Sequence, residues 1–232
     1  MGRHNGESLP LAVGLELGPK RRVFAQVLGW AGWGRSGRSP DEALAALVMC
    51  GERYAQVAAR AGLHVTLPGS TADLTIRDQV TGSPATDAGA LSALLGEDTA
   101  PLDDADVARL ASLLQACWAT FDDILASAPA SAPGTTRRKT RAPESVRLHV
   151  LEADFMHVGA FGPGFRQPNP ATVDAQFADV RSQILAGLQA VPRGRAFTGV
   201  RRYGFLWTPH FAVRRSAWHA LDHAWALQDR PH

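Results

Sequence analysis

The sequence is poor in cysteine, in lysine and in long apolar runs. Cys50 and Cys117 are the two cysteines of its 232 residues, which excludes a disulfide framework or a cysteine-ligated zinc site. We expect both to be reduced, half-buried helix residues, as is usual in a cytoplasmic protein. No apolar stretch approaches the length that spans a bilayer. These absences predict a soluble, cytoplasmic protein without a membrane partner.

Net charge is also small: Lys and Arg number 24, Asp and Glu 22, and the formal net charge is +2. Such a balanced chain has no overall field that attracts nucleic acid. The basic run at residues 137–141 lies in a segment rich in Pro and Ser, with no aromatic residues between its charges. That composition favours a solvated loop over a nucleic-acid interface. We therefore predict no nucleic-acid partner.

The first part of the chain has the pattern of a small mixed domain. Alternating apolar side chains predict short strands at residues 11–17, 22–28, 64–67 and 74–76. Ser39, Pro40 and Glu42 form a capping box that starts a helix, expected to continue to about residue 61. The Gly-rich connection before this helix is expected to be a loop, since the context of a dinucleotide-binding turn is absent.

The second part of the chain has the pattern of a helix bundle. Apolar residues at helical spacing predict four long helices, at residues 103 to about 125, 143–161, 171–191 and about 211–229. Four amphipathic helices of this length usually bury their apolar faces as a four-helix bundle. The sequence thus predicts an α+β protein with a small αβ domain at 1–81, a turn-rich linker at 82–102 and a bundle at 103–232.

Histidines on two of the predicted helices carry the strongest chemical signal. His219 and His223 are four residues apart, so both project from one face of the last helix. Two imidazoles at this spacing can reach one metal ion, whereas Ala220 stands where a zinc protease motif requires Glu. The same pair would also be compatible with partly buried polar side chains that bind no metal.

A third ligand is expected from a neighbouring helix. The helix at 143–161 offers His149 and His157, which are eight residues and therefore about 12 Å apart along the axis. Both cannot bind the same ion, so either one could complete the site. Three neutral imidazoles leave coordination positions open, as in a catalytic metal centre.

Residues 103–230 resemble the DinB/YfiT-like superfamily of four-helix bundles. The sequence HVLEAD that begins at His149 is similar to the family's second-helix pattern, a histidine followed by a hydrophobic residue and then by Ala and an acid. The sequence AWHALDH that ends at His223 is similar to the family's fourth-helix histidine pair. The family binds a divalent metal through these positions, so the resemblance implies that His149, His219 and His223 are metal ligands.

The resemblance also implies an activity. Characterised members of the superfamily use zinc or nickel in transferases and isomerases that act with low-molecular-weight thiols. We therefore expect zinc or nickel as cofactor, a small polar substrate and a thiol as partner molecule. The ion would lower the pKa of a bound thiol or water and so give a nucleophile at neutral pH.

No motif identifies the catalytic residues, but three acids are candidates. Glu152 and Asp154 follow His149 on the same helix, and either could act as a general base. Asp222 could orient a ligand histidine. Each of the three would equally fit an exposed helix surface.

Candidates for substrate contacts lie around the start of the last helix. Arg214 and Arg215, one turn before His219, could clamp an anionic substrate, or could form a solvated cationic face. Three further side chains that could line the mouth of a pocket, or pack as a lid on the bundle, are Tyr203, Trp207 and His210.

The N-terminal 80 residues or so resemble the HicB-like antitoxin partner domain. The strand and corner that end at Trp33, and the helix that starts with SPDEAL at Ser39, are similar to that family's elements. The resemblance implies a small αβ fold that forms an interface with a partner or with a second copy of the chain, as a homodimer. It makes Trp30 and Trp33 candidates for that interface and carries over no catalytic residue.

Two functions follow from these expectations. The first is a metal-dependent enzyme, with thiol transfer or a related metal-assisted nucleophilic reaction. The alternative is a non-catalytic binding or regulatory module, in which the HicB-like domain forms a protein interface and the bundle is scaffold.

Overall fold

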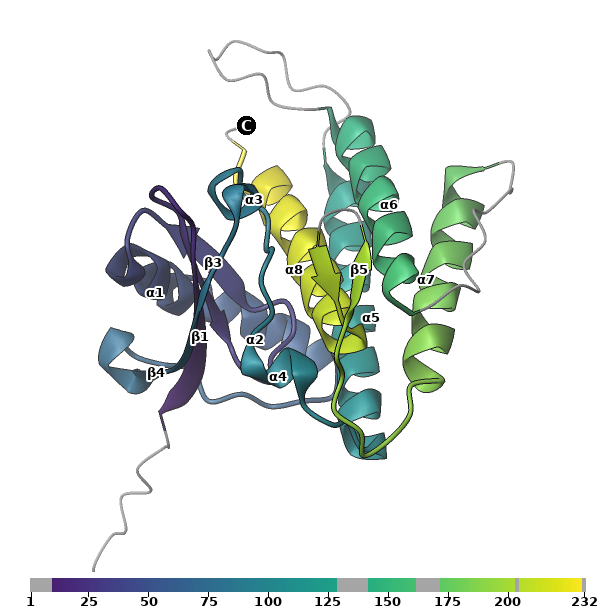
Figure 1. Ribbon diagram of the computed structural model, residues 1–232. Helices are drawn as coiled ribbons and strands as arrows, with labels where there is room; N and C mark the ends of the chain where they lie inside the picture. Colours follow the sequence, from purple (N-terminus) through teal and green to yellow (C-terminus); the bar gives the residue numbers. More distant parts are fainter. Residues whose placement is uncertain (1–9, 129–141, 162–171, 203–204, 231–232) are drawn as a thin grey trace, which may run out of the picture.

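The computed structural model describes residues 10–128, 142–161, 172–202 and 205–230 (Figure 1). Its elements are, in order, β1 (Leu11–Leu17), β2 (Val23–Val27), β3 (Gly34–Gly37), α1 (Pro40–Met49), α2 (Gly51–Arg60), β4 (Leu74–Thr81), α3 (Pro84–Asp87), α4 (Gly96–Thr99), α5 (Asp104–Ser127), α6 (Pro143–Val158), α7 (Val173–Gln189), β5 (Val200–Arg202), β6 (Phe205–Trp207) and α8 (Pro209–Gln228). The predicted α+β class is confirmed.

Strands β1 to β4 form one sheet in the order β3-β2-β1-β4, in which β4 runs parallel to β1 and the other neighbours are antiparallel. Helix α1 packs against β2 and β3, and α8 lies on the other side of the sheet (Figure 1). Every residue of β2 is buried, because the strand is central and both of its faces are covered. Phe24 on β2 meets Trp218 on α8 edge to face, with ring centroids 5.3 Å apart.

Two strand predictions were wrong. Residues 64–67 contain no strand, since Val65 is buried by packing into the core and not by pairing in the sheet. The Gly-rich connection, predicted as a loop, contains β3, which pairs with β2 along its full length. Its composition hides a strand because backbone hydrogen bonds to a buried neighbour, and not alternating apolar side chains, hold it in place. The hairpin β5-β6 was also missed, in a segment expected to be an irregular connection.

The helix predicted from Pro40 to about residue 61 is two helices. Ser39 caps α1 as expected, accepting a hydrogen bond from the backbone of Glu42. At Cys50 the backbone leaves helical geometry, and α2 starts at Gly51. Leu47, before the break, and Tyr54, after it, are both completely buried in the core.

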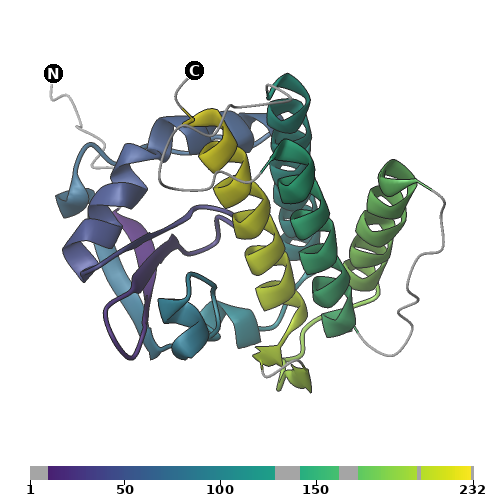
Figure 2. The ribbon, with the colours of Figure 1, turned by 90° about the horizontal axis from the view of Figure 1, so that it is seen from above.

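The four long helical segments predicted after residue 102 are confirmed as α5, α6, α7 and α8. Asp103 caps α5 through the backbone of Asp106, as its position in the sequence indicated. Helix α8 is the most enclosed: it packs on α5 and α6 and separates them from the sheet (Figure 2). The site described below therefore lies on a helix that contacts both parts of the molecule.

One apolar core runs through the sheet and the helices. It includes Val13 from β1, Leu47 from α1, Leu114 from α5 and Leu221 from α8. Residues 82–102, predicted as a linker, contain α3 and α4 and bury Leu95 among other side chains. The two sequence halves thus share one interior over the described residues.

The tryptophans proposed for an interface are differently placed. Trp33 is 1% exposed and stacks on Tyr54, and its indole donates a hydrogen bond to the carbonyl of Leu47. Trp33 is thus a core residue, and the interface assignment was wrong for it. Trp30 is partly buried, with the guanidinium of Arg109 4.2 Å from its ring.

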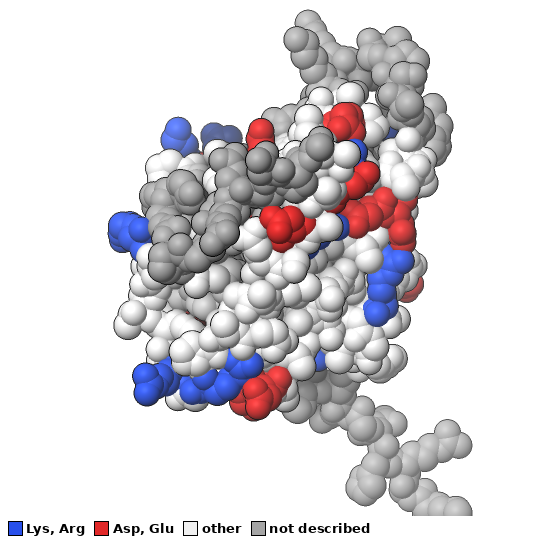
Figure 3. Space-filling view, turned by 90° about the vertical axis from the view of Figure 1, so that its right-hand side faces the viewer, with Lys and Arg blue, Asp and Glu red and all other residues white. Residues whose placement is uncertain are grey.

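The face shown in Figure 3 carries acidic and basic side chains in small groups of both signs, separated by uncharged surface. None of the helices in the described ranges combines the length and the apolar character that crossing a bilayer requires.

Candidate metal centre

Two facing helices, α6 and α8, bring the histidines together. His149 on α6 meets His219 and His223 on α8, while Asp154, further along α6, meets Ser216, which lies earlier on α8. Residue numbers thus rise along α6 as they fall along α8, so the helices are antiparallel. This pairing brings polar side chains of both helices into contact along the boundary between α6 and α8.

The three predicted ligands converge. The Nε2 atoms of His219 and His149 are 3.3 Å apart, and those of His223 and His219 are 3.1 Å apart. One ligand nitrogen from each residue lies within 4.8 Å of the others. Nitrogens bound tetrahedrally to zinc at about 2.0–2.1 Å are separated by roughly 3.3 Å, so these spacings match those of a common ion. The donor set and the spacing both fit a divalent metal.

The charge state of His219 also suits metal binding. Burial is the main reason that the pKa of His219 lies well below its usual value, and the neighbouring His223, His157 and His149 lower it further. A neutral imidazole is the form that binds a metal ion. Among the described residues the buried Nδ1 of His219 has no hydrogen-bond partner. The ring contacts its neighbours through Nε2, which faces His149 and His223.

His157 lies beside the triad and does not replace His149. It is 1% exposed, its Nδ1 is 3.3 Å from the carboxylate of Asp154, and its ring centroid is 6.3 Å from that of His219. Of the two candidates on α6, the structure brings only His149 into the cluster of ligand nitrogens. Burial lowers the pKa of His157 more than Asp154 raises it, so this ring is neutral at neutral pH.

A buried chain of hydrogen bonds holds His157 in place. The indole of Trp118 on α5 donates to the hydroxyl of Ser216, 3.2 Å away, and that hydroxyl donates to Asp154 at 2.7 Å. Asp154, a candidate general base from the sequence, is 1% exposed and binds His157 with the same oxygen. The carboxylate therefore acts on the orientation of His157. Sequence reasoning missed Ser216 and Trp118, which have no recognisable motif.

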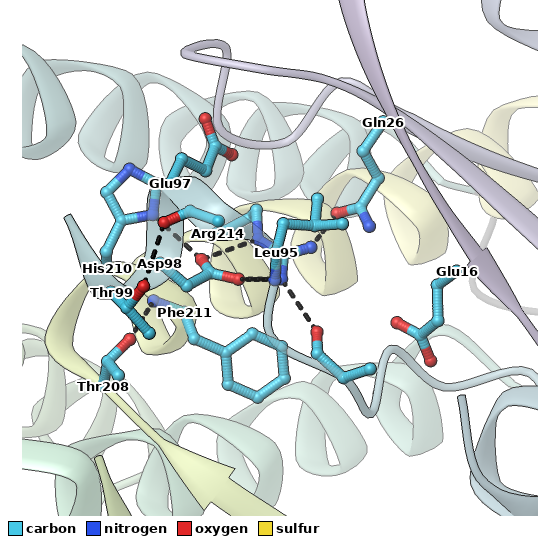
Figure 4. A network of polar contacts seen from close by, with 12 residues as sticks. Glu16, Gln26, Leu95, Glu97, Asp98, Thr99, Thr208, His210, Phe211 and Arg214 are labelled. Carbon is cyan, nitrogen blue, oxygen red and sulfur yellow. Dashed lines mark hydrogen bonds and ion pairs between the residues drawn. The ribbon is translucent and has the colours of Figure 1, made fainter. Parts of the chain in front are cut away.

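The two arginines before His219 have different surroundings. Arg214 is 3% exposed and forms a bidentate ion pair with Asp98 on α4, while it also donates to Gln26 and to the carbonyl of Ala93 (Figure 4). These contacts make Arg214 a structural link from α8 to the sheet and to α4. We do not retain it as a substrate contact.

His210 belongs to the same structural link. Its Nδ1 is 2.9 Å from Asp98, and it is 7% exposed (Figure 4). Burial by itself would raise the pKa of Asp98, but the charge of Arg214 and the hydrogen bonds from His210 and Arg214 hold it below its usual value. Glu97, Asp98 and His210 are close enough together to resemble a second metal site. Arg214 already supplies the cation there, so we assign this cluster to structure.

Arg215 lies four residues, or about one helical turn, before His219 on α8. It is 8% exposed, and its guanidinium is 5.2 Å from the ring of Trp207. Trp207 is 1% exposed and contacts His157, with ring centroids 5.7 Å apart. Trp207, predicted to line the mouth of a pocket, is therefore a buried side chain that packs against His157 and Arg215.

The other predicted residues lie away from the triad or outside the described residues. Glu152 is exposed. Asp222 forms an ion pair with Arg35 on β3 at 3.2 Å, so its nearest ionic partner is on the sheet and not a histidine. Tyr203 lies outside the described residues.

Comparisons with protein-family models, with curated proteins and with solved structures found no match to this chain.

Proposed function

We propose that this protein is a divalent-metal-dependent enzyme of the DinB/YfiT-like type, with His149, His219 and His223 as the metal ligands. The convergence of three imidazoles from two helices, at spacings that suit a single ion, carries the proposal. Zinc or nickel suits an all-imidazole donor set. When bound, the ion would act as a Lewis acid toward a thiol or a water molecule.

The reaction that we propose is thiol transfer, or a related nucleophilic reaction, on a small polar substrate. The resemblance of α6 and α8 to the family's two motifs supports this reaction type. The four helices α5 to α8 correspond to the DinB-like bundle in this proposal, and β1 to α2 correspond to the HicB-like part. The latter would provide an interface for a partner or for a second copy of the chain.

The protein's own residues have three tasks in this proposal. His149, His219 and His223 hold the ion. Burial keeps His219 neutral and so able to bind the ion. Asp154, held by Ser216, orients His157, so that a neutral imidazole is available as a hydrogen-bond partner for a substrate beside the ion.

Metal content tests the proposal. The protein would be purified without a histidine tag, supplied with zinc or nickel, and analysed by mass spectrometry for bound metal. We expect one ion per chain in the wild type and strongly reduced binding in His219→Ala and His223→Ala. His64→Ala is the matched control, because His64 is exposed and lies far from the triad in the chain. A wild type that stays metal-free when zinc and nickel are supplied would contradict the proposal.

A separate assay tests the reaction type. The metal-loaded protein would be incubated with low-molecular-weight thiols and small electrophilic substrates, with consumption of the thiol as the readout. Tight metal binding without any thiol consumption would remove the transferase assignment and leave the metal site intact.

A further inference from the structure

A polar hollow of about 530 Å³ lies where the connection between β1 and β2 meets the start of α1. That volume is in the range of small-molecule sites. Four cationic side chains, two carboxylates, Ser36 and Gly37 line it, and among the described residues no aromatic or aliphatic side chain does. The hollow therefore suits a small, strongly polar ligand. All of its lining residues precede α5, so it is separate from the histidine triad.

The cationic side chains of the hollow are exposed and take no part in the ion pairs of the fold. They belong to Lys20, Arg21, Arg22 and Arg38. Over the described ranges of the chain, every ion pair uses other cations. The two carboxylates of the lining are those of Glu42 and Asp87, so the positive charges of the hollow exceed the negative ones by two.

Asp87 on α3 fixes the backbone that carries three of these cations. Its carboxylate accepts hydrogen bonds from the backbone N–H groups of Lys20, Arg21 and Arg22, at 2.9, 3.1 and 3.1 Å. The connection packs so closely on this carboxylate that a Cβ added to Gly18 would lie 2.7 Å from it. Three consecutive N–H groups bound to one carboxylate hold the connection in one conformation, and the three cations are thereby kept beside the hollow.

The part of the lining that comes from β3 and α1 is also held by hydrogen bonds. Glu42 on α1 accepts one from the backbone N–H of Arg38 at 2.8 Å. The guanidinium of Arg22 donates to the hydroxyl of Ser36 on β3 at 3.2 Å, which joins the β1–β2 connection to β3. Both carboxylates of the lining thus bind backbone N–H groups, and the cationic side chains form no ion pair with them.

We propose that this hollow binds the phosphate group of a small molecule. A phosphate monoester carries about −1.5 to −2 charges at neutral pH, which matches the excess of two positive charges better than the single charge of a carboxylate does. Three of the four cations are arginines, whose guanidinium groups donate parallel pairs of hydrogen bonds to phosphate oxygens. The described lining has no aromatic ring on which a base could stack, so it favours a phosphorylated small molecule over a nucleic-acid strand.

Nuclear magnetic resonance titration of the full, metal-free chain at low ionic strength tests the inference. The probes are inorganic phosphate, glycerol 3-phosphate and acetate. We expect both phosphates to saturate one site per chain with a Kd of about 1 mM or tighter, and to shift the backbone signals of residues 20–22 and 36–38. Acetate should bind at least about tenfold more weakly because it carries about half the charge. Added sodium chloride should weaken phosphate binding, because the cations are exposed.

Two double variants distinguish the hollow from the overall charge of the protein. Arg22→Gln/Arg38→Gln should weaken phosphate binding by about tenfold or more, since two of the four cations are lost. Arg77→Gln/Arg195→Gln is the matched control, because it changes the net charge equally at exposed arginines outside the hollow. We expect its phosphate affinity to stay within about twofold of the wild type. Circular dichroism is recorded for each variant, and Arg38→Gln alone is used if the first double variant does not fold.

The inference would be overturned if the wild type showed no saturable phosphate binding or bound acetate equally well. Equal phosphate affinity in Arg22→Gln/Arg38→Gln, or an equal loss in the control pair, would overturn it as well. A single-stranded DNA dodecamer is a further probe: if it bound the same residues in preference to glycerol 3-phosphate, the surface would be one for nucleic acid.

The phosphate site and the proposed metal site can fail separately. His219→Ala should bind phosphate like the wild type, whereas loss of phosphate binding in this variant would place the anion at the histidines and overturn the inference. Arg22→Gln/Arg38→Gln should take up zinc like the wild type. A wild type that binds phosphate at residues 20–22 and 36–38 but takes up no zinc would contradict only the proposed function.

Discussion

The Nε2 atom of His219 lies 3.3 Å from that of His149, although 70 positions separate the two residues in the chain. Two neutral imidazole nitrogens gain little from such a contact unless a proton or a cation lies between them. The antiparallel pairing of α6 and α8 is what creates it, so the site depends on how these helices pack. Changes at the ligands and changes in the packing around them are therefore separable by experiment.

The choice between His149 and His157 as the third ligand leads to the first prediction. His149→Ala should reduce zinc affinity by at least about 100-fold because a ligand is lost, whereas His157→Gln should reduce it by no more than about tenfold because only a neighbour changes. Competition with a chromophoric chelator measures both affinities. If His157→Gln were the more damaging of the two, the ligand assignment on α6 would have to be reversed.

The second prediction concerns the buried ion pair between Asp98 and Arg214. Asp98→Asn leaves the buried guanidinium without its counter-charge, and should lower the free energy of unfolding by about 3–5 kcal/mol. Chemical denaturation monitored by circular dichroism measures the change. Asp104→Asn is the matched control, because the ion pair of Asp104 with Arg193 is exposed and should contribute little. A difference between the two variants below about 1 kcal/mol would show that the link from α4 to α8 is not important for stability.

The same pair predicts a pH dependence. The pKa of Asp98 is lower in the folded protein than in the unfolded chain, where it is about 3.9. The stabilisation from this group is therefore complete above pH 4 to 5 and is lost as the pH falls through the folded pKa. We expect the stability difference between wild type and Asp98→Asn to be constant near neutral pH and to shrink below about pH 4. Unfolding curves at several pH values measure it, and a difference that grew on acidification would contradict the expected sign.

Ser216 provides the third variant. Its hydroxyl donates to Asp154, whose other oxygen is buried without a hydrogen-bond partner among the described residues. Ser216→Ala removes a donor from a buried carboxylate and should cost about 1–3 kcal/mol in unfolding free energy. Ser112→Ala, at a partly exposed hydroxyl that donates to the carbonyl of Ala108 one turn before it on α5, should cost much less. Equal effects of the two substitutions would argue against the buried chain that orients His157.

The two cysteines give a prediction about reactivity. Both are buried, and burial is the main cause that raises the pKa of Cys50 and of Cys117. The thiolate is the reactive form, so an aromatic disulfide reagent at pH 8 should modify the folded protein on the order of 100-fold more slowly than the unfolded chain. Rapid modification of Cys50 or Cys117 in the folded protein would show that the thiol is accessible.

The sequence by itself determined the long helices of the second half of the chain and the shared helix face of His219 and His223. Apolar spacing after residue 102, together with the caps at Asp103 and Ser39, was enough to place the long helices and the start of α1, because these signals act within a few residues. The four-residue spacing of His219 and His223 fixed their shared face for the same local reason.

Only the tertiary structure decided the rest. The sequence could not choose between His149 and His157, since both are on one helix and the choice depends on the register of α6 against α8. Nor could it separate Arg214 from Arg215, because the partner of Arg214 is Asp98, 116 residues away in a segment that resembled a linker. Strand β3 escaped prediction because its stability comes from a neighbouring strand. In each case the deciding interaction joins residues far apart in the chain, and such contacts leave no local pattern.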